Sequence, residues 1–176
     1  MTEDEVHPPV PESVPDEVLE TIAPLEEADA TPAPPPRERL AYLGFYVGQE
    51  VYGLPLGQLR EVARLTRLRH IPGAPAGVAG LVNLRGEIVC AIDVRAILGL
   101  AAQAPADSAF LVALRDFDDP VGLIVDSIAD IYSIDPGEIE PTPETWSPER
   151  RACFVGTIQV PVGMMGLLDV HRVVRT

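Results

Sequence analysis

The side chains that most often carry out chemistry in proteins are few in this sequence and stand far apart. The three histidines are His7, His70 and His171, and the two cysteines are Cys90 and Cys153. No Cys or His has the spacing of a metal site. The cysteines lie in apolar surroundings, where buried, reduced thiols are the ordinary interpretation. Each histidine is best interpreted as solvated or structural, so these residues predict neither a metal centre nor a catalytic base.

Short motifs of common enzyme sites are also missing. The sequence has no Walker loop, no glycine-rich dinucleotide fingerprint, no His-Glu-x-x-His, no Cys-x-x-Cys and no Gly-x-Ser-x-Gly elbow. The adjacent carboxylates Asp118 and Asp119 fall among turn formers, where aspartate is favoured for its backbone conformation alone. We therefore expect no catalytic residue, no cofactor and no small-molecule substrate. A small enzyme with a site between two lobes is the weakest alternative, because no nucleophile–base pair is evident.

One basic cluster lies in the first half of the chain: Arg60, Arg64, Arg67 and Arg69. No aromatic residues interleave with it, as a platform for single-stranded nucleic acid would require. Two interpretations stay open. The arginines are either the charged face of an edge strand, which protects it against mispairing, or part of a protein contact surface.

Charge divides the chain into two parts. Residues 1–36 hold ten of the 27 acidic residues, nine of the 19 prolines and no Lys or Arg, and every one of the 13 basic residues is an arginine. An acidic protein is repelled by nucleic acid and by anionic membrane surfaces. No apolar run approaches the ~20 residues of a membrane span, and no signal peptide opens the chain. We expect a cytoplasmic protein without a nucleic-acid partner or membrane insertion.

The proline-rich acidic segment at residues 1–39 is predicted to be a disordered tail, because it cannot bury enough surface to offset its ordering entropy. Within it, Pro15–Ile22 carries an apolar stripe behind a proline and two acids, which is typical of a short nascent helix. That stretch is either incidentally helical or a docking peptide.

From Leu40 the pattern changes to short β-rich runs separated by glycine and proline. A short helix is expected at Pro75–Val78, one helical turn at Leu56–Glu61 and a short helix at Val94–Leu100. Strands are expected at 40–47, 51–54, 62–69, 88–94, 110–114, 121–125, 128–134, 154–160 and 164–170. About nine or ten such strands predict an all-β barrel architecture. The punctuation divides residues 40–176 into two halves of roughly 60–70 residues, and two small barrels would bury faces that neither could hide alone.

The most distinctive run is Pro75–Arg95, which contains Asn83, the only asparagine in the chain. Asn83-Leu84-Arg85-Gly86 reads as a tight turn between apolar strands, because Asn can bond its own backbone and Gly accepts a positive φ. Arg85 is then held at a defined corner, from which its side chain can be directed at a partner.

The run resembles the signature of CheW domains, in which P-x-x-V-x-G-L-x-N-L-R-G precedes an apolar strand. Tyr52–Val62 and Val121–Ile128 resemble two further family segments, and Gly166–Val170 resembles the closing strand. The resemblance spans about residues 40–175, in order and with comparable spacing. Cys90 and Val94 depart from it, since the family often has Pro and Leu there.

The resemblance implies two intertwined five-stranded SH3-like β-barrels and a non-catalytic adaptor. Such proteins bind the cytoplasmic tip of chemoreceptors and the regulatory domain of a CheA-type histidine kinase, in arrays on the inner face of the membrane. The positions that match the family's coupling surface are Leu59, Glu61, Val62, Asn83 and Arg85. Leu59 and Val62 would supply apolar contact area, and Glu61 and Arg85 polar register.

A second function stays open beside this one. The chain would then be a CheW-like localisation factor whose acidic tail recruits a polar or partitioning protein, with Pro15–Ile22 as the recruiting segment.

Overall fold

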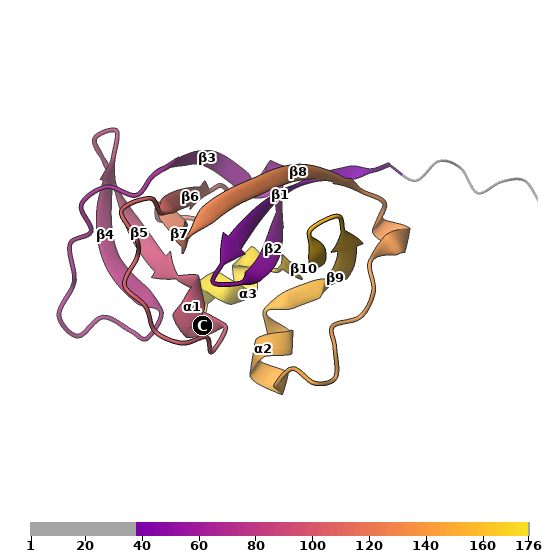
Figure 1. Ribbon diagram of the computed structural model, residues 1–176. Coiled ribbons are helices and arrows are strands. Elements are labelled where there is room, and N and C mark those ends of the chain that lie inside the picture. The colour runs from indigo at the N-terminus through magenta and orange to yellow at the C-terminus, as the bar shows by residue number, and fades with distance from the viewer. Residues whose placement is uncertain (1–37, 176) are drawn as a thin grey trace, which may run out of the picture. The chain divides into compact units, whose positions relative to one another are not determined.

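The computed structural model describes residues 38–175 (Figure 1). The expected acidic tail lies outside them up to residue 37, and with it the Pro15–Ile22 stretch. No helix within the described residues is long and apolar enough to cross a membrane.

Ten strands and a few short helices make up the described chain, as expected of an all-β protein. The helices are α1 (Val94–Ile97), α2 (Pro148–Ala152) and α3 (Val170–Arg175), with single 3-10 turns at Leu56–Gln58 and Pro136–Glu138. The strands are β1 (Leu40–Val47), β2 (Glu50–Pro55), β3 (Leu59–Arg64), β4 (Val78–Leu84), β5 (Glu87–Asp93), β6 (Phe110–Leu114), β7 (Val121–Val125), β8 (Ser127–Ile134), β9 (Phe154–Val160) and β10 (Gly163–Leu168).

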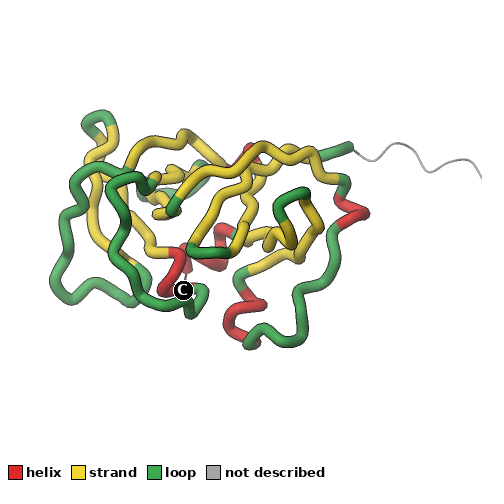
Figure 2. The backbone as a smooth tube through the Cα atoms, in the orientation of Figure 1, coloured by secondary structure: helices red, strands yellow, loops and turns green. Residues whose placement is uncertain are grey.

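The strands form two five-stranded sheets, which we call the terminal and central lobes. The terminal lobe has the order β8-β1-β2-β10-β9, and the central lobe has the order β3-β6-β7-β5-β4. The two five-stranded lobes are as predicted, but the division into successive halves was wrong. The terminal lobe takes strands from both ends of the described chain and the central lobe takes the middle (Figure 1). Figure 2 shows the strands in yellow and the few short helices in red. Glycine and proline mark where strands end and not which strands pair. Their positions could therefore not show that the terminal lobe combines strands from both ends of the described chain.

Each sheet closes on itself through one short bridge. In the central lobe, the segment after β3 reaches the far edge strand, where Arg69 and Leu81 exchange two backbone hydrogen bonds of 2.8 Å. In the terminal lobe, the segment after β8 does the same, and Glu140 and Thr157 exchange two bonds of 2.8 Å. Both edges of each sheet are thereby joined, which turns the sheets into small barrels.

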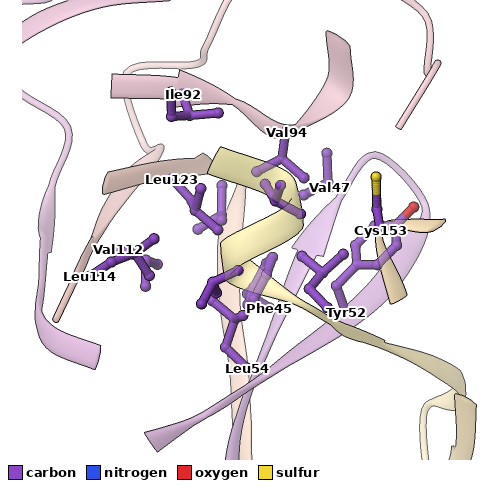
Figure 3. Packing of buried hydrophobic residues seen from close by; sticks show 14 of the residues in the cluster. Phe45, Val47, Tyr52, Leu54, Ile92, Val94, Val112, Leu114, Leu123 and Cys153 are labelled. Carbon is purple, nitrogen blue, oxygen red and sulfur yellow. The ribbon is translucent and has the colours of Figure 1, made fainter. Parts of the chain in front are cut away.

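Three apolar clusters hold the fold together. One fills the central lobe around Leu111 and another fills the terminal lobe around Met165. The largest lies between the lobes, and it contains Phe45 and Tyr52 from one and Leu123 from the other (Figure 3). Strand β6 shows why: alternate side chains face the lobe interior and the neighbouring lobe, so the strand is buried on both faces. This confirms that the barrels bury apolar faces against each other.

A polar contact accompanies this packing where the chain passes from one lobe to the other. Asp126 lies between β7 and β8, and its carboxylate pairs with Arg95 of α1. The same carboxylate accepts a 2.6 Å hydrogen bond from the amide of Gly48, in the β1–β2 turn of the terminal lobe. The Arg95 side chain is only 11% exposed. The two lobes are thus linked at the junction by contacts among Arg95, Asp126 and Gly48.

Local expectations failed at a few places. The helix expected at Pro75–Val78 is a turn that leads into β4, and Gly77 there has a φ of +95°, outside the helical region. β3 begins at Leu59 and ends at Arg64, since the residues after it turn away to make the bridge at Arg69. The helix α2 was not expected. It begins with Ser147, whose hydroxyl accepts a hydrogen bond from the Arg150 amide, followed by Pro148 at its first position.

Candidate functional site

The turn between β4 and β5 has an unusual backbone. Leu84 pairs with Glu87, so Arg85 and Gly86 alone form the turn, with φ values of +53° and +94°. Two positive φ angles in succession are those of a type I′ hairpin turn. Glycine accepts this conformation freely, but an arginine there costs about 1 kcal/mol or more. The Asn83 side chain accepts a 2.9 Å hydrogen bond from the Gly86 amide and so stabilises the turn.

Strand β3 brings the other predicted residues beside this turn. Leu59 points into the core and is 7% exposed, whereas Val62 points outward and is 38% exposed. Glu61 is half-buried, with a side chain that is 25% exposed. From Glu61 to Arg64 half-buried and exposed residues alternate, because successive side chains of a strand leave opposite faces, and a bulge separates this run from Leu59.

Two ion pairs join β3 to the β4–β5 turn. The Nε of Arg85 lies 3.0 Å from a carboxylate oxygen of Glu61, and a guanidinium nitrogen of Arg60 lies 2.6 Å from one of Glu87. Each partner segment thus supplies one cation and one anion. The Arg85 side chain is 81% exposed, so this pair contributes about 0–1 kcal/mol to stability and is open to exchange with an outside carboxylate.

The structure therefore brings three of the five predicted residues together. Glu61, Asn83 and Arg85 lie at the seam between β3 and the turn, and the exposed Val62 follows Glu61 on β3. Leu59 offers a partner little surface in this conformation, since it packs in the cluster between the lobes.

Sequence reasoning missed three neighbours of this site. The sequence indicates Arg60 only as a member of the basic cluster, and it gives no sign that Glu87 pairs with it. Ile88 is 54% exposed, although it belongs to a run that reads as uniformly apolar. Its cross-strand partner Asn83 is polar and exposed, and that pairing is the signal that could have revealed it.

The residues suited to chemistry are scattered over the described chain. Burial raises the pKa of the Cys90 and Cys153 thiols, which favours the weakly nucleophilic protonated form. The His171 ring packs on Phe117, with ring centres 5.1 Å apart. Within residues 38–175, no group of three or more His, Cys, Asp or Glu side chains could hold a metal ion.

Comparison with known proteins places these features in a family. The profile of the CheW-like domain family matches residues 41–176. The chemotaxis protein CheW of Rhizobium meliloti (strain 1021) is 30% identical over 131 residues, which are 74% of this chain and 84% of that protein. The chemotaxis protein CheW of Helicobacter pylori is 30% identical over 117 residues, covering 66% of this chain and 71% of that protein.

A solved structure agrees with the sequence comparison. The crystal structure of the scaffolding protein TtCheW from Thermoanaerobacter tengcongensis superposes with a TM-score of 0.68 at 25% identity, over 77% of this chain and 87% of that one. The family profile covers both lobes, together with the β3 strand and the β4–β5 turn that form the candidate site. This chain belongs to the CheW-like domain family.

Proposed function

We propose that the seam between β3 and the β4–β5 turn is the surface through which this chain, a non-catalytic chemotaxis scaffold, couples a chemoreceptor to a CheA-type histidine kinase. The residues that contact the partner are Glu61, Val62, Asn83 and Arg85, and Leu59 supports them from below. The partners are the cytoplasmic tip of the receptor and the regulatory domain of the kinase. The chain works in receptor arrays on the inner face of the membrane.

The observation that carries this proposal is the placement of Arg85. A hairpin turn normally favours Asn-Gly at its two central positions, yet an arginine occupies the first in the left-handed region. Strain of this kind is often retained where function needs the side chain at a fixed place. Arg85 projects into solvent and pairs with Glu61, the residue before the exposed Val62, so a planar, bidentate donor and apolar area are offered by the same two segments.

The proposal is tested with Arg85→Glu. Because the pair with Glu61 is largely exposed, the reversal should lower the free energy of unfolding by no more than about 1 kcal/mol. At the interface it replaces attraction by repulsion, and a loss of about 3 kcal/mol weakens binding more than a hundredfold. Binding to purified receptor tip and kinase regulatory domain is measured by calorimetry. Arg115→Glu is the matched control, since Arg115 is exposed at the end of β6 in the same lobe.

A charge swap separates partner contact from a purely structural role. The double variant Glu61→Arg with Arg85→Glu restores an ion pair within the chain but presents the opposite charges to a partner. If Arg85 contacts the partner, the swap does not restore binding. Recovery of full binding by the swap would show that the pair acts only within the fold, and the proposed surface would be wrong.

A further inference from the structure

Positive charge is concentrated in one stretch of an otherwise acidic chain. Between Glu61 and Glu87 there is no Asp or Glu, whereas the same stretch holds Arg64, Arg67, Arg69 and Arg85. The whole chain has a formal net charge of −14. The stretch includes β4, the bridge that closes the central lobe and the segment that leads to that bridge. A local field of opposite sign to the whole molecule attracts an acidic partner to this one place.

The arginines of the sequence cluster separate into two kinds. Arg60 pairs with Glu87, and Arg64 lies over the Phe110 ring, 4.6 Å from its centre. Arg67 and Arg69 are exposed, and neither side chain has an ion pair or a hydrogen bond to another residue among residues 38–175. The edge-strand interpretation accounts for the first two, which lie on β3. It does not account for Arg67 and Arg69, which follow the strand.

These two arginines line a groove of about 490 Å³ on the outer face of the central lobe. Its other walls come from the β4–β5 hairpin and include Leu81, Asn83 and the exposed side chain of Ile88. The groove thus presents two guanidinium groups and one side-chain amide beside an apolar surface. A carboxylate accepts two parallel hydrogen bonds from a guanidinium, and an apolar side chain is favourably buried on Ile88.

We propose that this groove binds an acidic segment of a partner protein, with carboxylates on Arg67 and Arg69 and an apolar side chain on Ile88. The apolar surface favours polypeptide over nucleic acid, because the groove lacks the aromatic side chains on which bases stack. This site goes beyond the proposed coupling surface, with which it shares only Asn83.

The test uses the full chain and a random peptide library displayed on phage. Selected peptides are expected to be rich in Asp and Glu with at least one large apolar residue. The most frequent one is then synthesised with a fluorescent label, and its affinity is measured by anisotropy. Arg67→Glu with Arg69→Glu should weaken binding more than about tenfold. Arg115→Glu with Arg175→Glu, which alters the net charge equally at two other exposed arginines, should change binding less than about twofold.

Three results would overturn the proposal. The first is a set of selected peptides that is not enriched in Asp and Glu. The second is equal binding of the peptide by the groove variant and its control. The third is displacement of the peptide by a single-stranded oligonucleotide of comparable affinity, which would identify a nucleic-acid site. Circular dichroism and thermal melting of the groove variant should match the wild type, since both arginines are exposed. The probe contains neither receptor nor kinase, so its outcome is independent of the coupling function.

Discussion

The terminal and central lobes are built alike. The two strand orders correspond position by position: β3-β6-β7-β5-β4 in the central lobe matches β8-β1-β2-β10-β9 in the terminal lobe. Each lobe has one parallel pair, β5 with β7 and β10 with β2. Each of these pairs ends in an aspartate, Asp93 or Asp169, whose carboxylate accepts amide hydrogen bonds from the short helix that follows. Features that occur in both lobes are therefore those that the fold itself requires.

The connections between equivalent strands differ. From β8 to β9 the chain forms a 3-10 turn and helix α2, and it packs Trp146 on Phe154 with ring centres 4.8 Å apart. From β3 to β4 it has no helix, carries Arg67 and Arg69 and leaves a groove open. Ion pairs join β3 to the β4–β5 turn, and within residues 38–175 no ion pair joins β8 to the β9–β10 turn. What distinguishes the central lobe is thus its surface, which is where partner binding is proposed.

The largest expected effect tests the shared closure of the barrels. A Cβ on Gly80 would overlap the carbonyl oxygen of Arg69, and one on Gly156 would lie 2.6 Å from that of Glu140. Alanine at either position should lower the free energy of unfolding, by about 3 kcal/mol at Gly80, whose φ is +150°, and by about 2 kcal/mol at Gly156.

Urea unfolding measures both glycine variants. Gly57→Ala serves as the control and should cost no more than about 0.5 kcal/mol, because nothing lies within 4 Å of its added Cβ. Wild-type stability in Gly156→Ala would show that the two bridges are not equivalent and that the two barrels do not close in the same way.

A smaller effect is expected at the junction of the lobes. Arg95→Ala leaves the Asp126 carboxylate with the Gly48 amide alone, and we expect a loss of about 2 kcal/mol, less than for a fully buried pair because Asp126 is part-exposed. Glu138→Gln, which removes the exposed pair with Arg39, should cost under about 0.5 kcal/mol. Thermal melting compares the two variants. Equal melting temperatures would mean that apolar packing alone holds the lobes together.

The smallest effect concerns the one cysteine of each lobe. Burial raises the pKa of both thiols above the usual 9.0, and the nearby Asp119 adds to the rise at Cys90. A raised pKa contributes stability below about pH 9 that is lost as pH rises through the folded-state value, because the unfolded chain ionises first. The melting temperature should therefore fall less steeply above about pH 9 in Cys153→Ala than in the wild type.

Cys90→Ala should show a weaker change in slope, since Cys90 is less buried than Cys153. The comparison uses slopes, so a constant difference in stability between the variants does not affect it. An unchanged slope in Cys153→Ala would show that its thiol ionises alike in the folded and unfolded chains.

The sequence predicted more of the fold than of the site. Strands such as β1 and β6 were placed to the residue because apolar runs end at turn formers. The exchange of β1 and β2 into a lobe with β8–β10 depends on distant pairing and came only through the family resemblance. Arg85 was placed correctly at a tight corner by its neighbours Asn83 and Gly86. Burial of Leu59 was not foreseen, since the bulge between Leu59 and Glu61 shifts the pairing with β6.

Because the terminal lobe takes strands from both ends of the described chain, its strands are synthesised at different times. The central lobe is one continuous stretch from Leu59 to Val125, so all its strand pairs can form as soon as that stretch leaves the ribosome. The β1–β2 hairpin emerges first, yet its remaining partners β8 and β10 are made after the central lobe is complete. Until then its two outer edges stay unpaired and are open to pairing with another nascent chain. The first two strands to be made are therefore among the last to reach all their native neighbours, and the time before β10 is made is when their edges need protection from other chains.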